Sequence, residues 1–100
     1  MRLGILVTTD RYLVQIRGIT QAALAKGHAD AIFATDDGTK LLTNHQFSSQ
    51  RSLPGVSMSF CDLSAQRHGG RPADLPEAIA SGSQFENAVM ASVSDKVIVL

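Results

Sequence analysis

The sequence predicts an α/β protein, with three α/β/α layers around a parallel sheet of four or five strands, flavodoxin-like in general layout. Short apolar runs alternate with segments whose apolar residues recur at helical spacing, which is typical of strands joined by right-handed helical crossovers. The 100 residues fit one domain, residues 1–100. The composition, 44% hydrophobic and 18% charged, is that of a globular domain and not of a disordered or fibrous chain.

The first half of the chain contains two expected strands. Residues 3–7 are a compact apolar run, as expected for a strand covered on both faces. Residues 13–27 repeat apolar or small side chains at helical spacing and end at a glycine, which favours a helix. Residues 29–35 form the second expected strand, and a modest helix around Leu41 and Leu42 follows it.

The middle of the chain predicts a third strand. Residues 44–54 are polar and end in a Leu-Pro-Gly turn. Residues 56–60 alternate, so that Val56, Met58 and Phe60 share one face, while two serines on the other face predict close approach of a helix or poor cover. A short helix is expected over residues 62–68, capped by Asp62 and ended by two glycines, and residues 71–82 are expected to form a loop.

The last part of the chain predicts a helix and a final strand. Ser83 and Glu86 have the spacing of a capping box, in which each side chain satisfies a free amide at a helix start. The expected inward-facing side chains of this helix are Phe85, Ala88, Val89, Ser92 and Val93. Residues 97–100 are rich in β-branched side chains, and such an apolar end is expected either inside the sheet or against another subunit.

Polar side chains are expected to gather at one edge of this sheet. Open parallel sheets bind ligands beyond the carboxyl ends of their strands. In this chain, those ends and the start of the last helix are expected to form the rim of a ligand pocket. The rim residues are Thr8, Thr9, Asp10, Asp37, Gly38, Gly82 and Ser83.

Cys61 is the candidate reactive residue at this edge. It ends a strand and precedes a helix, where the helix dipole and free amides favour a thiolate. Asp62 opposes ionisation, and Arg67 on the following helix offsets that effect. The alternative is that Cys61 is a small buried hydrophobic residue without chemistry.

Other site classes are poorly supported. No two of the three histidines have the spacing of a helical metal site, so no metal is expected. Asp36 and Asp37 are better explained by a cap and a turn than by magnesium, and neither a phosphate-binding loop nor a flavin sandwich is present. We therefore expect no cofactor.

The charge balance and apolar runs restrict the partners. Nine Lys and Arg balance nine Asp and Glu, so no basic excess predicts nucleic-acid binding, and near neutrality permits self-association into a homo-oligomer. The apolar run near the start is far shorter than the ~20 residues of a membrane span. The single cysteine agrees with a reducing compartment, so we expect a cytoplasmic protein that does not bind membranes.

The chain resembles the DsrE/DsrF-like family, which includes the TusD-type sulfur-relay subunits. The resemblance spans nearly the whole chain in short pieces. These are Leu3-Gly-Ile-Leu-Val-Thr-Thr9, Lys26-Gly-His28, Asp37-Gly38, Val56-Ser-Met-Ser-Phe-Cys-Asp-Leu-Ser-Ala-Gln-Arg-His-Gly69, Gly82-Ser83 and Ser94-Asp-Lys-Val-Ile-Val99.

The resemblance implies an oligomeric protein in which Cys61 carries sulfur as a persulfide between a donor protein and an acceptor protein. The amides of Leu63 and Ser64, the Ser83 hydroxyl and the charge of Arg67 are the expected supports of that sulfur. The chain is shorter than typical relay subunits, and many short members have no assigned activity. A non-catalytic oligomeric module, binding a small molecule or serving as a scaffold, therefore remains the alternative.

Overall fold

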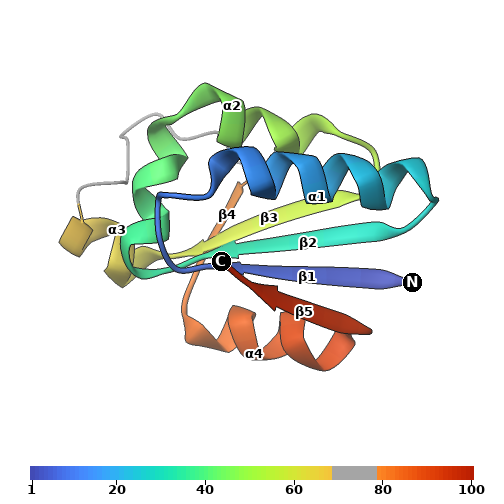
Figure 1. The fold of residues 1–100 in the computed structure, drawn as a ribbon. Coiled ribbons are helices and arrows are strands. Elements are labelled where there is room, and N and C mark those ends of the chain that lie inside the picture. The colour runs from blue at the N-terminus through green and yellow to red at the C-terminus, as the bar shows by residue number, and fades with distance from the viewer. Residues whose placement is uncertain (69–78) are drawn as a thin grey trace.

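The computed structural model describes residues 1–68 and 79–100, which contain one sheet of five parallel strands (Figure 1). The strand order is β4-β3-β2-β1-β5, so β1 lies inside the sheet and the last strand lies at an edge. The strands are β1 (Arg2–Val7), β2 (Ala29–Ala34), β3 (Val56–Cys61), β4 (Ile79–Gly82) and β5 (Lys96–Val99).

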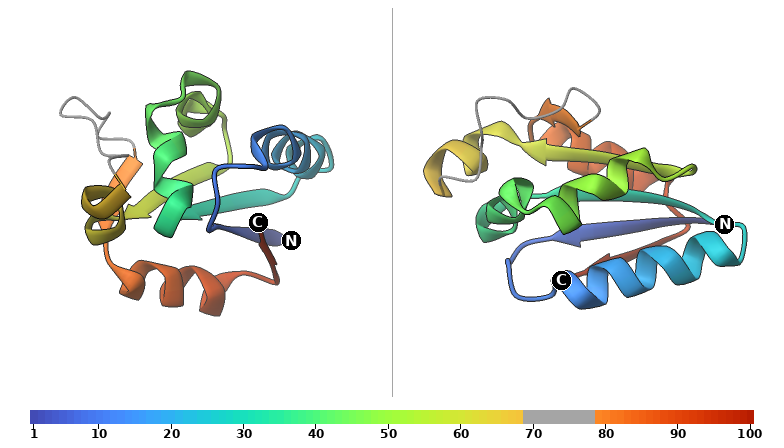
Figure 2. Two further views of the ribbon diagram at one scale, coloured as in Figure 1. Left: turned by 60° about the vertical axis from the view of Figure 1, so that its left-hand side comes forward. Right: turned by 90° about the horizontal axis from the view of Figure 1, so that it is seen from above.

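Helices lie on both faces of the sheet, which confirms the predicted three layers (Figure 2). One face carries α1 (Leu13–Ala25) together with η1 (Asp36–Thr43), α2 (His45–Ser48) and η2 (Ser49–Ser52). The other face carries α4 (Gln84–Val93), while α3 (Asp62–His68) lies at the carboxyl edge of the strands and packs against η1. No helix among the residues described is long and apolar enough to cross a membrane.

The larger part of the core lies between the sheet and the α1 face. Large apolar side chains from every layer of this face are buried there, including Ile5, Ile16, Ile32, Phe47 and Phe60. A smaller cluster of Phe33, Cys61 and Met90 is buried on the α4 face. The predicted shared face of Val56, Met58 and Phe60 is confirmed, since all three belong to the larger cluster.

The prediction of a loop over residues 71–82 is wrong for its last part, because Ile79–Gly82 forms the edge strand β4 beside β3. Only Ile79 of this strand is buried, and the other three residues are small. The segment therefore lacks the apolar run that predicts a strand from sequence. The rest of that loop, and the two glycines expected to end α3, lie outside the residues described.

Two further short elements were not predicted. The polar residues 44–54 contain α2 and η2, which are anchored by the fully buried Phe47. One aromatic residue in a polar segment gives no periodic signal. The helix around Leu41 and Leu42 is present as a 3₁₀ helix, with both leucines buried.

The predicted inward stripe of the last helix is wrong. Met90 is the buried residue of α4, whereas Phe85, Val89 and Val93 are 70%, 43% and 49% exposed. The final strand is not inside the sheet either, because β5 is an edge strand whose Val97 and Val99 are exposed. In both cases the helical or strand pattern shows which residues share a face, but it does not show what covers that face.

Candidate functional site

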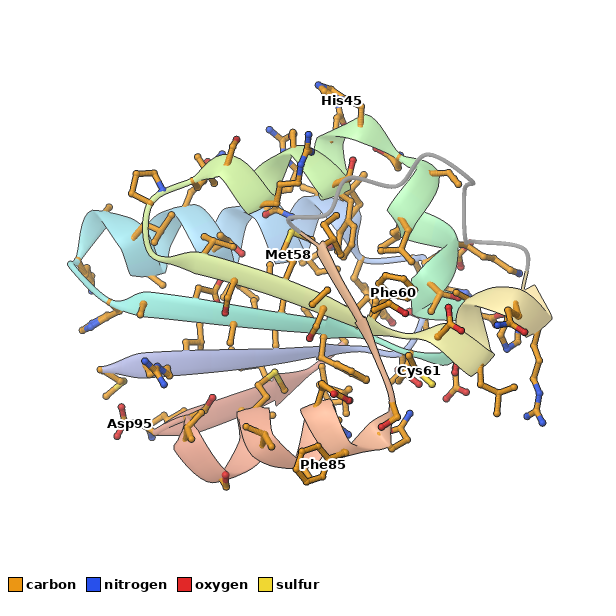
Figure 3. The ribbon with its side chains drawn as sticks, turned by 180° about the vertical axis from the view of Figure 1, so that it is seen from behind. His45, Met58, Phe60, Cys61, Phe85 and Asp95 are labelled. Atoms are coloured by element: carbon orange, nitrogen blue, oxygen red, sulfur yellow. The ribbon has the colours of Figure 1, made fainter. Side chains whose placement is uncertain are left out.

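Cys61 is the last residue of β3 and directly precedes α3. Figure 3 shows it at the edge of the sheet, near the start of α4. Its neighbour on the adjacent strand is Gly82, with which it is paired in register. The site is therefore built where the ends of β3 and β4 meet the beginnings of two helices.

Cys61 occupies the position of a helix N-cap for α3. An N-cap side chain accepts hydrogen bonds from the amides two or three residues further on, which have no partner within the helix. The Cys61 sulfur accepts from the amides of Leu63 and Ser64, so a sulfur takes the place of the usual capping oxygen. A thiolate accepts such bonds better than a thiol, so the helix start favours the charged form.

Side-chain donors complete the surroundings of this sulfur. Burial raises the pKa of the Cys61 thiol, but the Ser64 hydroxyl and amide, the Gln84 side chain and the Leu63 amide together outweigh burial. The net effect is a pKa below the ordinary value of a thiol. Such a thiolate is both nucleophile and metal ligand in proteins.

A chain of hydrogen bonds orients these donors. Gln84 Nε2 donates to Thr35 Oγ1 at 2.8 Å, and Thr35 Oγ1 lies 3.2 Å from Ser64 Oγ. Asn87 Nδ2 holds the other end of the amide by donating to Gln84 Oε1 at 3.3 Å. When Thr35 donates to Ser64, the Ser64 hydroxyl proton is left for the Cys61 sulfur, which agrees with its effect on the thiol pKa.

The sulfur itself is covered. The Cys61 side chain is 6% exposed and belongs to the cluster with Phe33 and Met90 on the α4 face. It nevertheless lies at the rim of the sheet and not at its centre. Chemistry at this atom therefore requires a small opening movement at the edge, where β3, α3 and α4 meet.

The other residues expected around Cys61 serve different contacts. Asp62 Oδ2 accepts from Gln66 Nε2 at 2.7 Å, and it is the first residue of α3 instead of its cap. Arg67 is exposed in the last turn of α3 and is not among the groups that shift the pKa of Cys61. Ser83 is occupied by the capping box of α4, where its hydroxyl accepts from the Phe85 amide at 3.2 Å.

Gly82 serves the same capping box. A side chain at Gly82 would approach the Glu86 carboxylate carbon to 2.5 Å, so the position admits only hydrogen while Glu86 caps the helix. The Glu86 carboxylate accepts from the Ser83 amide at 2.6 Å, which holds the pKa of Glu86 below its usual range. Gly82 and Ser83 therefore set the direction in which α4 leaves the sheet and where Gln84 lies.

The remaining rim residues tie the chain together. The Thr8 amide donates to the carbonyl of Leu100 at 2.6 Å, and Gly38 packs against the carbonyl of Val7, where a side chain would not fit. Asp37 pairs with Lys40 at 3.3 Å and with His68 Nδ1 at 3.0 Å. Thr9 and Asp10, which follow Thr8 in the chain, are half-buried and exposed, respectively.

A groove of about 660 Å³ lies elsewhere, between α4 and the uncovered part of the sheet. None of the five rim residues from Thr8 to Gly38 lines it. Its walls include Phe85, Val89 and Val93 of α4, and its floor is formed by β2, β3 and β4. Among the residues described, no group of three or more potential metal-ligating side chains gathers anywhere.

Sequence reasoning missed Gln84, and it placed Thr35 at the end of the second strand without assigning it a role beside Cys61. Both lie at the predicted rim, Thr35 directly after β2 and Gln84 at the first position of α4, so the topology could have identified them. Gln84 lies 23 positions after Cys61 in the sequence, so no local pattern links the two residues. A glutamine gives no motif, and only the three-dimensional arrangement shows its role.

Comparison with known proteins shows the fold. No protein-family model and no curated protein sequence matches the chain. Among solved structures, the ychN protein of E. coli matches with a TM-score of 0.78 at 14% identity, over 100% of both chains. MTH1491 of Methanobacterium thermoautotrophicum, described as a protein of unknown function, matches with a TM-score of 0.72 at 17% identity, over 99% of this chain and 98% of its own.

The likeness establishes the architecture. The chain has a flavodoxin-like α/β fold, which it shares with these two proteins over 99% and more of its length. At such low identity the likeness concerns the backbone arrangement and does not extend to side-chain chemistry.

Proposed function

We propose that this chain is a DsrE/DsrF-like sulfur carrier of the cytoplasm, in which Cys61 holds a sulfane sulfur between a donor and an acceptor protein. The observation that carries the proposal is the position of Cys61 directly before α3 and beside the Gln84–Thr35–Ser64 hydrogen bonds, where neighbouring donors lower its pKa. These donors stabilise a thiolate, and they come from two helices whose starts meet at the end of β3. A merely packed cysteine does not need them.

The chemistry is two successive thiol exchanges without net oxidation or reduction. The Cys61 thiolate attacks the outer sulfur of a donor persulfide, forms a new S–S bond, and releases the donor as a thiolate. The acceptor thiolate then attacks the outer sulfur now carried on Cys61, and Cys61 leaves again as a thiolate. The groups that lower its pKa act in both steps, because Cys61 is the nucleophile first and the leaving group second.

The direct test is sulfur loading. The protein is incubated with a small persulfide donor, and its intact mass is measured before and after treatment with a reductant. We expect a reducible gain of ~32 Da, the mass of one sulfur atom added to the thiol. Cys61→Ser is the matched control, since it removes the only thiol of the chain. A wild-type chain that gains no mass would refute the carrier function.

A second candidate is a non-catalytic binding or scaffold module in which Cys61 is packed. Its 6% exposure and the groove beneath α4 favour this alternative. The two candidates differ in the rate of native alkylation. A carrier opens its edge locally, so iodoacetamide should react much faster than the whole protein unfolds, whereas a packed cysteine reacts only at the rate of global unfolding.

A further inference from the structure

Among the residues described, none covers the sheet beside α4. Of the helices described, α4 is the one that lies on this face, where it packs against β1, β2 and β3. Most residues of the floor next to it are small, namely Ala29, Ala31, Gly55, Ser57, Ser59 and Ala80. Asp30, Ile32, Val56 and Met58 also line the groove, and the last three belong to the core cluster on the opposite face. In the layer on the opposite face, the same strands carry large buried side chains beneath helices.

The wall of the groove is an apolar row on α4. Phe85, Val89 and Val93 follow one another at intervals of four residues, so they lie on one side of the helix. They line the groove although they are 70%, 43% and 49% exposed. A continuous apolar row bordering a flat floor of small residues is typical of a surface that is covered in an assembly.

We propose that this face binds a second copy of the chain, whose α4 lies in the groove antiparallel to α4 of the first. The lengths agree. Ten helical residues extend about 15 Å, and the floor along β3 from Gly55 to Ser59 extends about 13 Å. The small residues of the floor allow a helix backbone to approach closely, so the second α4 takes the place of a helix layer that residues 1–68 and 79–100 do not provide here.

The charges at the two ends of the groove favour this occupant. Arg2 lines the groove at the end where α4 finishes, because the Asp95 amide just beyond α4 donates to the Arg2 carbonyl, and the Asp95 carboxylate accepts from the Arg2 amide at the same end. Glu86 lines the groove in the first turn of α4, at the opposite end. A two-fold axis that pairs the helices antiparallel places Glu86 of each copy near Arg2 of the other, which is the self-complementarity that an isologous interface requires.

A stable interface buries about 600–1,000 Å² on each partner, between a tenth and a fifth of the 5491 Å² surface of this chain. A dimer of this kind must therefore bury surface around the groove as well as the groove itself. Because the formal net charge is zero, charge repulsion between two copies does not oppose this association.

The first experiment measures mass in solution against concentration, by sedimentation or light scattering. We expect a dimer whose dissociation constant rises at least tenfold in Val89→Glu. The matched control is Val14→Glu, which places the same charge on a valine of α1 that is 79% exposed on the other face of the sheet. A chain that stays monomeric at millimolar concentration overturns the proposal, as does a dimer that Val14→Glu weakens and Val89→Glu does not.

The second experiment tests the antiparallel orientation. Arg2→Glu should weaken the dimer by bringing two carboxylates together, and adding Glu86→Gln should restore part of the affinity. Glutamine keeps the capping box, so the double variant remains folded. In a Cys61→Ser background, Val89→Cys should form a disulfide between copies across the axis, and Val14→Cys should not. Absence of rescue together with absence of the Val89→Cys bridge refutes this geometry.

These results do not depend on sulfur chemistry, because the variants leave Cys61 and its donors unchanged except in the cross-linking background. A dimer without sulfur loading would refute the carrier function alone. Loading on a permanent monomer would refute the interface alone.

Discussion

Ser64→Ala is the sharpest test of the thiolate site. The Ser64 hydroxyl is 8% exposed, lies 3.2 Å from Thr35 Oγ1, and is the side-chain group that most lowers the pKa of Cys61. A hydrogen bond to a charged group contributes about 1.5 kcal/mol at the low end of its range, which is about a tenfold loss of thiolate at any pH below the midpoint. The Leu63 and Ser64 amides remain, so the site is weakened and not abolished.

The assay is the rate of alkylation by iodoacetamide as a function of pH. A thiolate of higher pKa is also a better nucleophile, with a Brønsted slope of about 0.45. The rate well below the midpoint should therefore fall only about threefold, while the plateau at high pH should rise about threefold. A pKa effect therefore makes the pH profiles of the variant and the wild type cross. A change in the access of iodoacetamide to the sulfur would instead move the low-pH rate and the high-pH rate in the same direction.

Ser59→Ala is the matched control for this experiment. Ser59 lies on the same strand, two residues before Cys61 and on the same face, yet it does not contribute to the thiol pKa. Its profile should overlay that of the wild type. If Ser64→Ala changes the low-pH and high-pH alkylation rates in the same direction, or leaves the midpoint unchanged, the Ser64 hydroxyl does not lower the pKa of Cys61.

Three further predictions concern α4 and the core. Gln84→Ala should shift the alkylation midpoint upward as well, because it removes a donor to Cys61 and the donor that orients Thr35; an unchanged profile would exclude Gln84 from the site. Ser83→Ala should cost about 1 kcal/mol in urea unfolding through loss of the cap of α4, and a loss below a few tenths would show that the cap is not needed. Burial raises the pKa of Asp30, which the Thr20 hydroxyl and the Ala31 amide only partly offset. The folded protein therefore holds this proton more tightly than the unfolded chain, and stability falls as pH rises from the unfolded pKa of about 3.9 through the folded pKa. Asp30→Asn should accordingly be more stable than the wild type at pH 7, with a difference that shrinks as pH is lowered toward 4; a difference independent of pH would contradict the assignment.

The strands buried on both faces could be predicted from sequence because their signal is local. Residues 3–7 are a compact apolar run and residues 29–35 are centred on the apolar pair Ile32 and Phe33, and both segments lie inside the sheet as β1 and β2. The edge strand β4 gave no such signal, because three of its four residues are small and only Ile79 is buried. Its place in the sheet comes from backbone hydrogen bonds to β3, which any residue except proline can make.

The position of Cys61 could be predicted for a similar reason. The end of a parallel strand followed by a helix start always lies at the carboxyl edge, so residue order alone brought Cys61, Leu63 and Ser64 together. Gln84 could not be placed in this way. Its contact with Cys61 depends on the angle at which α4 leaves β4, which is set by the capping box of Ser83 and by the absence of a side chain at Gly82.

The exposed face of α4 was predicted as buried because helical spacing shows which residues share a face but not what covers that face. Helical spacing correctly grouped Phe85, Val89 and Val93, but an apolar row faces whatever apolar surface is available, in the same chain or in another one. In this chain the sheet accepts Met90 instead, and the row borders a floor of small residues. The helix α4 thus has two roles in these proposals: its first residue orients the donors of Cys61, and its apolar row forms the surface proposed to bind a second copy. Closure of the groove by a second copy would hold α4 in place, and with it the Gln84 amide that points at the sulfur.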